Sequence, residues 1–140
     1  MVASNDEVGA MQLFEEIIKN SEDFLVSLGL PYRVMELCTG EMGAPQRYKR
    51  DIETWMPSRQ RYSETHSCSW IGEFQARRLN MRYKDAAGKT QYCHTLNNTL
   101  VASPRVLIPL LECNQQADGS IAIPAVLQPY MGGQTVIKKP

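Results

Sequence analysis

The sequence predicts an α+β fold in which an antiparallel sheet is flanked by helices. A chain of 140 residues with 43% hydrophobic and 21% charged residues has the composition of one soluble globular domain. Apolar residues recur at three- and four-residue steps near the N-terminus, as in a helix, and most of the chain beyond residue 31 consists of short strand-like segments between turns. Helices of ten or more residues do not alternate with these segments, which argues against parallel βαβ units.

The first element is predicted to be a helix that covers one face of the sheet. Ser4 and Glu7 fit a capping box at its start. Its apolar residues follow helical spacing: Val8, Met11, Phe14, Ile17, Ile18, Leu25 and Leu28. Gly29 can supply a left-handed stop and Pro31 prevents continuation, so the helix is expected to end there.

The middle of the chain is predicted to form strands, two antiparallel hairpins and one short helix. Turn-forming residues occupy 57–60 and 85–88, and each hairpin is centred on one of these segments. The expected order is a strand over 32–38, a loop over 39–45, a hairpin of 48–56 with 61–68, a helical stretch over 71–78 and a hairpin of 79–83 with 89–97.

The C-terminal part is predicted to begin with a helix and to end as an irregular cover. Pro104 opens an apolar helix over 106–111 that runs out near Asn114. Residues 118–120 (DGS) form a turn signal. The tail from Ile121 contains prolines and a glycine pair, so we expect one short strand followed by irregular chain.

Charge and cysteine content exclude several classes of function. Fifteen basic and fifteen acidic residues give a net charge of zero, which excludes a strongly basic nucleic-acid-binding domain but not a local basic patch. Basic residues cluster at 47–50, 59–61 and 77–84 with acidic residues among them, a pattern typical of a solvated face. No apolar run has the length of a membrane span, and the N-terminus carries no secretory or organellar signal. The four cysteines form no C-x-x-C pair, which favours reduced thiols over a zinc site.

One polar segment, 64–67 (ETHS), ends a predicted strand. A carboxylate together with hydroxyls could bind a hard cation or a ribose. The alternative is an edge strand with ordinary polar residues, and the spacing alone favours this alternative. Both interpretations stay open at this point.

A second polar segment runs from His94 to Arg105. Thr95, Asn97 and Thr99 share one face of an extended strand, and Arg105 lies near a helix start, where it could bind an anion. The alternative is a solvent-facing strand surface. His94 alternates with Tyr92 and Leu96, so it is expected to be a hydrogen-bonded, half-buried strand residue.

Several phrases of the sequence are specific when taken together. They are 28–34 (LGLPYRV), 38–43 (CTGEMG), 51–57 (DIETWMP), 64–69 (ETHSCS), 74–78 (FQARR), 94–97 (HTLN) leading to Arg105, 111–120 (LECNQQADGS) and 124–133 (PAVLQPYMGG). In this combination the chain resembles the catalytic domain of seryl-tRNA synthetases over essentially its whole length. Asn98, Thr99 and Pro104 are more similar to the mitochondrial branch of that family.

The resemblance implies a partial class II aminoacyl-tRNA synthetase catalytic domain, whose fold is an antiparallel sheet flanked by helices. The implied activity is ATP-dependent activation of serine to seryl-adenylate, followed by transfer of serine to tRNA. Residues 1–140 would be the C-terminal portion of the domain, with the tRNA-binding coiled-coil arm, motif 1, the Thr-x-Glu loop and the motif 2 Arg-x-Glu upstream. The chain alone is therefore expected to be inactive.

The same resemblance assigns roles to individual residues. Arg105 matches the catalytic arginine that holds the γ-phosphate of ATP. Asn97 and Thr99 match positions that recognise serine. The implied ATP-binding residues are Glu64, Thr65, His66, Ser67 and Arg105.

Glu64 and Ser67 would also hold the Mg²⁺ that accompanies ATP. Residues i and i+3 point to opposite sides of a flat strand. This role therefore requires a bulge or bend between the two residues.

The implied partners are serine, ATP, tRNA(Ser) and, in the full-length protein, a second copy in a homodimer; no membrane is involved. The resemblance favours a mitochondrial location, with the cytoplasm as the alternative. The alternative function is a non-catalytic paralogue that acts as a binding or assembly partner.

Three residues depart from the family pattern: Trp70 replaces the usual Asn, His66 replaces a small Ser, and Pro109 lies within the predicted motif 3 helix. A proline there removes one backbone hydrogen bond and costs about 3 kcal/mol or kinks the helix, which bears on the placement of Arg105.

Overall fold

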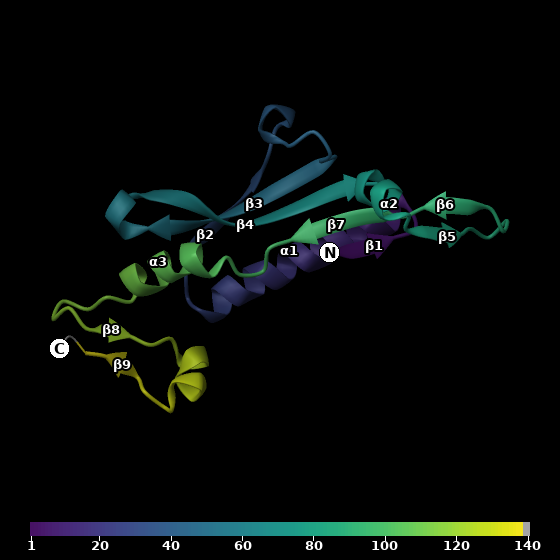
Figure 1. The fold of residues 1–140 in the computed structure, drawn as a ribbon. Coiled ribbons are helices and arrows are strands. Elements are labelled where there is room, and N and C mark those ends of the chain that lie inside the picture. Colours follow the sequence, from purple (N-terminus) through teal and green to yellow (C-terminus); the bar gives the residue numbers. More distant parts are fainter. Residues whose placement is uncertain (139–140) are drawn as a thin grey trace.

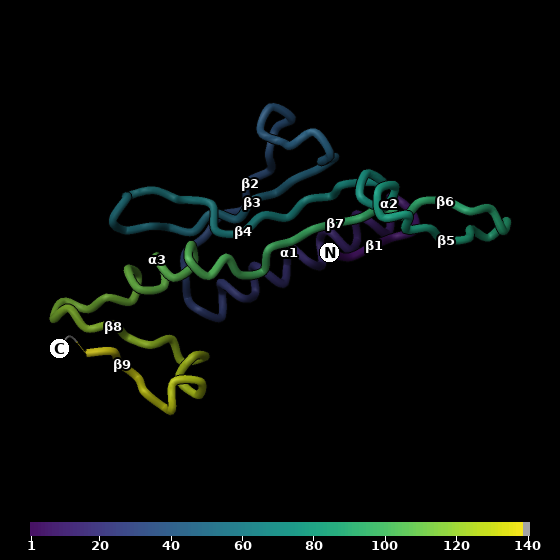
Figure 2. Tube along the Cα trace, in the orientation of Figure 1, coloured from purple at the N-terminus to yellow at the C-terminus, as the bar shows by residue number. Residues whose placement is uncertain are grey.

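The computed structural model describes residues 1–138 and contains one five-stranded main sheet, helices packed on it and two small two-stranded sheets (Figures 1 and 2). The strand order is β1-β7-β4-β3-β2, and every neighbouring pair is antiparallel. The strands are β1 (Val2–Ser4), β2 (Tyr32–Glu36), β3 (Tyr48–Met56), β4 (Arg61–Gly72) and β7 (His94–Asn98). The predicted antiparallel sheet flanked by helices is confirmed; residues 139–140 of the predicted 1–140 segment lie outside the described residues.

Helix α1 (Glu7–Ser27) lies along one face of the main sheet and supplies most of the core. Phe14 and Leu25 are fully buried on its inner side, and they belong to one cluster with Ile52, Cys68 and Leu96 from the strands. Burial of such side chains stabilises the fold by about 1.5–3 kcal/mol each. The sheet therefore has one face that is closed by this helix.

The start of α1 differs from the prediction. Asp6, rather than Ser4, is the N-cap: its Oδ1 accepts a hydrogen bond of 2.6 Å from the Gly9 N–H. Ser4 instead ends strand β1, which pairs with β7 and was not predicted. Because Asp and Ser are equally good caps, the sequence pattern alone could not choose between them. The predicted end is confirmed, since Gly29 has φ +69°.

Two predicted boundaries in the middle of the chain are wrong. Strand β4 continues through Gly72, so the following helix α2 covers only Phe74–Leu79. The second hairpin is split: β5 (Arg82–Lys84) pairs with β6 (Thr90–Tyr92), and the chain then enters the main sheet as β7. Apolar residues occur at both ends of this segment, and the sequence therefore predicted one long hairpin of 79–83 with 89–97.

The C-terminal elements follow the prediction closely. Helix α3 (Ser103–Cys113) lies on the same side of the sheet as α1, and its Val106 belongs to the same core cluster. Beyond it, β8 (Ile121–Ala122) pairs with β9 (Val136–Ile137), and a 3₁₀ segment (Ala125–Met131) lies between them. None of the helices described for residues 1–138 is long and apolar enough to cross a membrane.

Candidate active site on the open face of the sheet

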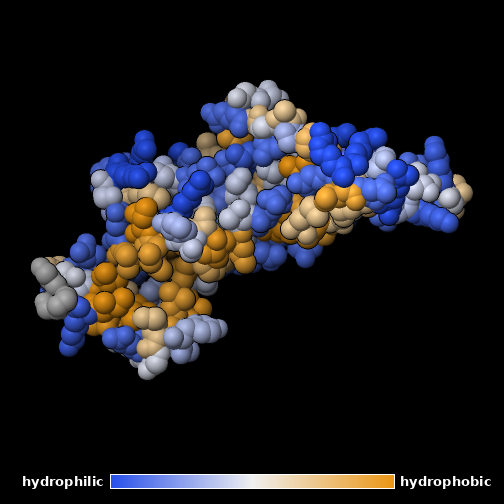
Figure 3. Space-filling view, viewed as in Figure 1, coloured by the Kyte–Doolittle hydropathy of each residue, from blue (hydrophilic) through white to orange (hydrophobic). Residues whose placement is uncertain are grey.

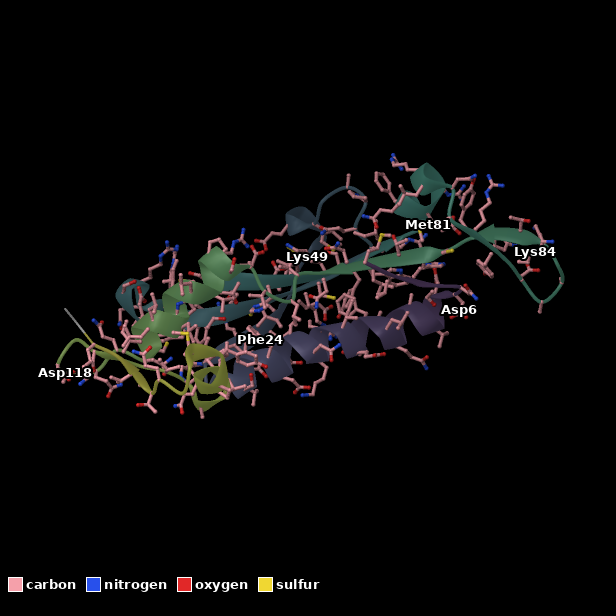
Figure 4. All side chains as sticks on the ribbon, turned by 60° about the horizontal axis from the view of Figure 1, so that its bottom comes forward. Asp6, Phe24, Lys49, Met81, Lys84 and Asp118 are labelled. Carbon is pink, nitrogen blue, oxygen red and sulfur yellow. The ribbon has the colours of Figure 1, made fainter. Side chains whose placement is uncertain are left out.

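The main sheet has a second face that is turned away from α1, here called the open face. On β7, Leu96 packs into the core and the Asn98 amide donates to the Ile17 carbonyl of α1 (2.8 Å), so even-numbered residues face the helix. Alternation then places Thr95 and Asn97 on the open face. Figure 4 shows the two sides, with Phe24 on α1 and Lys49 across the sheet from it.

A β-bulge in β4 places Glu64 and Ser67 on the same face. Ile52 pairs with His66 while the next residue, Glu53, pairs with Glu64, so Thr65 is the extra residue in β4. Ile52 faces α1, and both Glu64 and Ser67 therefore face the open side. The predicted requirement for a bulge or bend between the two residues is confirmed.

The side chains of Thr65 and His66 lie in the interior instead. Thr65 is fully buried; its hydroxyl is 2.6 Å from the Thr54 hydroxyl and 2.8 Å from Nδ1 of His66. The His66 ring is 1% exposed and lies 6.2 Å from the Phe24 ring of α1. These two predicted ATP-binding residues can therefore offer a ligand on the open face only their backbone.

The buried His66 makes stability pH-dependent. Burial lowers the pKa of His66 below its usual 6.5, and the nearby Leu100 backbone offsets part of this effect. Below pH 6.5 the unfolded chain binds this proton more readily than the folded protein does. We expect the free energy of unfolding to fall as the pH drops from 6.5 toward the lowered pKa.

Urea unfolding between pH 7.5 and pH 5, compared with His66→Gln, measures this effect. The variant should lose stability at pH 7.5 through altered packing but should show a flatter profile over the range. The same slope in both proteins would contradict the assignment.

Arg105 and Glu64 meet at one end of the open face. Nη1 of Arg105 lies 2.9 Å from Oε1 of Glu64, although 41 residues separate them in the chain. The side chains are 55% and 40% exposed, so the pair adds at most about 1 kcal/mol to stability. Both groups are therefore available to exchange partners with ligand charges: the carboxylate with a cation, the guanidinium with a phosphate.

Pro109 does not displace Arg105. Helix α3 continues from Ser103 to Cys113 with Pro109 inside it, buried. In a regular helix the N–H of residue 109 would donate to the carbonyl of Arg105, and this is the bond that proline removes. The loss falls on the first turn, and the Arg105 side chain still reaches Glu64.

The two predicted serine-binding residues lie beside Ser67 and Ser69. Asn97 pairs with Ser69 across β7 and β4, and the Thr99 N–H donates to the Ser67 carbonyl (3.0 Å), which extends the ladder by one residue. Asn97 and Thr99 are both exposed. Cross-strand neighbours lie about 5 Å apart. Together with Glu64 and Arg105, these residues form one polar surface.

Thr95, the third residue of the predicted polar face, is not available to a ligand. It is fully buried, and its hydroxyl donates to Oε1 of Gln75 (2.9 Å) in α2. His94 is also more deeply buried than predicted, at 8% exposure; its Nδ1 has no hydrogen-bond partner in the described part of the chain, and the ring lies 5.7 Å from the Trp70 ring. Trp70 and His94 are even-numbered residues on the helix side, so neither reaches the open face.

Asp51 and Lys49 belong to this surface but were not predicted as site residues. Asp51 pairs with Ser67, and Lys49 pairs with Ser69. Asp51 is 7% exposed; Oδ2 of its carboxylate lies 3.0 Å from the Lys49 ammonium, and Oδ1 has no hydrogen-bond partner among residues 1–138. The signal available in the sequence was the strand alternation of 49, 51 and 53, with a carboxylate on two of the three.

The donor set suits a magnesium ion that a ligand brings with it. Within residues 1–138 no three His, Cys, Asp or Glu side chains are grouped so that they could hold a metal ion. Glu64 and Ser67 supply a carboxylate and a hydroxyl, and Asp51 adds an unpartnered oxygen nearby. Magnesium is often held by one or two carboxylates together with substrate phosphates, so these residues fit such an ion.

The chain is similar in sequence to a known family and to named proteins. A model of the tRNA synthetase class II core domain (G, H, P, S and T) matches residues 2–114. The chain is 54% identical over 135 residues to the serine–tRNA ligase of Deinococcus radiodurans, which covers 96% of this chain and 32% of that protein. It is 49% identical over 124 residues to the serine–tRNA ligase of Laribacter hongkongensis, with 89% and 29% covered.

Solved structures show the same fold. The seryl-tRNA synthetase from Pyrococcus horikoshii complexed with ATP matches with a TM-score of 0.93 and 39% identity, over 99% of this chain and 31% of that one. The cytoplasmic serine–tRNA ligase from Naegleria fowleri in complex with AMP matches with a TM-score of 0.88 and 38% identity, over 97% and 28%. The chain spans about a third of the length of the curated relatives it matches. With most of its length matched by the family model, the chain belongs to the class II tRNA synthetase core domain family (G, H, P, S and T).

Proposed function

We propose that the chain is part of a serine–tRNA ligase and forms the C-terminal portion of its catalytic domain. The observation that carries this proposal is the Arg105–Glu64 pair beside Asn97 and Thr99 on one open sheet face. These groups suit a phosphate, a cation and a small hydroxyl-bearing substrate. The names of the relatives support the same reaction.

The proposed reaction has two steps. In the first, a carboxylate oxygen of serine forms a bond to the α-phosphorus of ATP, and the bond to the leaving pyrophosphate breaks. In the second, a ribose hydroxyl at the 3′ end of tRNA(Ser) attacks the carbonyl carbon of seryl-adenylate and releases AMP. The complete protein would act on serine, ATP and tRNA(Ser) and form a homodimer.

Arg105 and Glu64 would act on the phosphate end of ATP. The guanidinium of Arg105 binds the γ-phosphate and stabilises the charge that develops on pyrophosphate. Glu64 and Ser67 would hold the Mg²⁺ that accompanies ATP, and this ion supplies positive charge against the phosphate oxygens. In the ligand-free arrangement Arg105 and Glu64 neutralise each other, so neither charge has to be buried before ATP arrives.

Asn97 and Thr99 would recognise serine. Both are exposed on the strand and its extension that lie beside β4. A hydroxyl and an amide can pair with the hydroxyl of serine, and a site of this kind disfavours alanine because its polar groups are then left without partners.

No observation favours the alternative of a non-catalytic paralogue. Two departures from the family pattern, Trp70 and His66, lie on the helix side of the sheet. Pro109 leaves the Arg105–Glu64 contact in place. A mitochondrial location stays a prediction that rests on the resemblance alone.

A chimera tests the proposed function. This chain would replace the matching 135 residues of the Deinococcus radiodurans relative, which leaves the rest of that protein unchanged. We expect serine-dependent exchange of pyrophosphate into ATP and charging of tRNA(Ser), whereas the 140 residues alone should show neither. A folded chimera that binds ATP but exchanges no pyrophosphate would overturn the proposal and favour the paralogue.

A further inference from the structure

Two arginines at the far end of the sheet from Arg105 have no acidic partner. Arg78 lies on α2 and Arg82 on β5, and both are exposed. Within residues 1–138, Arg33, Arg47, Arg50, Arg77 and Arg105 each pair with a carboxylate, but no carboxylate oxygen lies within 4.0 Å of Arg78 or Arg82. Their charges are therefore uncompensated locally.

Aromatic rings hold both guanidiniums in place. The Cζ atom of Arg78 lies 3.4 Å from the Phe74 ring centroid, and its Nη1 donates to the Phe74 carbonyl (3.1 Å). The Cζ atom of Arg82 lies 4.7 Å from the Tyr92 ring centroid, and its Nη2 donates to the Tyr92 hydroxyl (2.8 Å). Stacking leaves the remaining N–H groups of each guanidinium plane free, which is the geometry for a bidentate bond to an oxyanion.

The surroundings are positively charged although the whole chain is neutral. Residues 73–92 contain five basic side chains and two acidic ones. Asp85 accepts bonds from the N–H groups of Ala87 and Lys89 inside its own turn, and Glu73 pairs with Arg77 (2.5 Å). Figure 3 shows the hydrophilic colour gathered at this end of the molecule. A hollow next to it is lined by Arg47, Phe74, Arg77 and Arg78 among others.

We propose that Arg78, Arg82 and Lys84, here called the α2–β5 basic surface, bind the phosphodiester backbone of the tRNA substrate; this rests on the proposed function. The rings of Phe74 and Tyr92 already stack on guanidiniums, and the charges they hold in place would bind phosphates without reading sequence. Tyr92 also lies two residues before β7 (His94–Asn98), the strand that contains Asn97. The α2–β5 basic surface therefore lies at the start of the strand that carries the proposed serine site.

The same chimera allows a test with a matched control. Arg78→Gln with Arg82→Gln removes both free guanidiniums. Arg59→Gln with Arg61→Gln, in and after the turn between β3 and β4, removes two other exposed arginines that have no carboxylate within 4.0 Å in the described residues. Pyrophosphate exchange needs no tRNA and should stay within about twofold of the parent in both variants.

Charging of tRNA should separate the two variants. We expect the KM for tRNA(Ser) to rise about tenfold in the Arg78/Arg82 variant and to stay unchanged in the control, because each phosphate contact adds a salt-dependent increment to affinity. The slope of log K against log salt should become shallower by about 1.4–1.8 for two lost contacts. Lys84→Gln removes one contact and disturbs no ring contact, so it should make the same slope shallower by about 0.7–0.9. This single variant replaces the double variant in the test if the double variant is poorly folded.

Three outcomes would overturn the inference. One is an equal KM for tRNA in the Arg78/Arg82 and Arg59/Arg61 variants; another is a salt slope that Lys84→Gln leaves unchanged. The third is competition by poly-L-glutamate as strong as by unacylated tRNA, which would indicate an acidic protein as the partner. Loss of exchange in the parent chimera refutes the proposed function instead, so the two failures are distinguishable.

Discussion

Replacing Arg105 with alanine in the chimera is expected to lower kcat/KM for ATP in pyrophosphate exchange by about 10²–10³-fold. Removal of one electrostatic donor to a charge that develops in the transition state typically costs about this much in rate. Discrimination between serine and alanine should be preserved, because the residues proposed to bind serine, Asn97 and Thr99, lie on β7 and its extension. Steady-state exchange kinetics with ATP as the varied substrate measure the effect.

Two further variants separate two contributions to activity: the shape and charge of the Arg105 side chain, and its ion pair with Glu64. Arg105→Lys keeps the charge but loses the planar fork, so it should recover only part of the activity. Glu64→Gln removes the partner and should impair ATP use through the cation, with the defect eased by excess Mg²⁺. The exposed pair adds little to stability, so unfolding midpoints should barely change in any of these variants. Normal exchange in Arg105→Ala would show that this helix start does not bind ATP.

The fold was predictable where local pattern and tertiary structure agree. The apolar spacing of α1, the turn after Met56 and the proline that opens α3 each specify an element by themselves. Strand β1 was missed because three residues carry no periodic signal, and it exists only through its pairing with β7. Likewise, β4 was expected to end at Cys68, although it extends to Gly72 because β7 pairs with its far end.

The candidate site could be predicted in part of its members but not in the orientation of their side chains. Glu64, Ser67, Asn97 and Arg105 come together on one face, as the resemblance implied. Which side chains of the segment 64–67 face outward depends on the single bulge residue, because one extra residue reverses the alternation along the rest of a strand. The shared role implied for Glu64 and Ser67 required a bulge between them, but the sequence did not indicate that Thr65 is the bulged residue.

Asp51 shows a second limit of the sequence. Its carboxylate lies in a row with Ser67 and Thr99 across three neighbouring segments of the sheet. Strand alternation determines on which face of the sheet a residue lies. Which residues of neighbouring strands lie side by side depends on the register between the strands. Register is a tertiary property, and here the bulge shifts it by one residue within the β3–β4 pair.

Replacing Thr99 with valine should alter serine recognition while leaving ATP use intact. Valine has nearly the same shape but no hydroxyl, so the hydroxyl of serine loses one bonding partner. A buried polar group left without a partner costs about 1–3 kcal/mol, so the KM for serine should rise about tenfold to hundredfold and discrimination against alanine should weaken by a similar factor. Exchange kinetics with serine and alanine as alternative substrates measure both quantities.

The fold should tolerate this change, because the contact that positions Thr99 comes from its backbone. The Thr99 N–H donates to the Ser67 carbonyl, and valine keeps this bond. Thr90→Val, at an exposed threonine in β6 outside the main sheet, is the matched control and should leave serine kinetics unchanged. If Thr99→Val and Arg105→Ala each disturbed serine and ATP alike, the two roles would not be separable. Thr99 and Arg105 would then act as one unit through the loop that joins β7 to α3, and the assignment of serine to the strand and ATP to the helix start would be wrong.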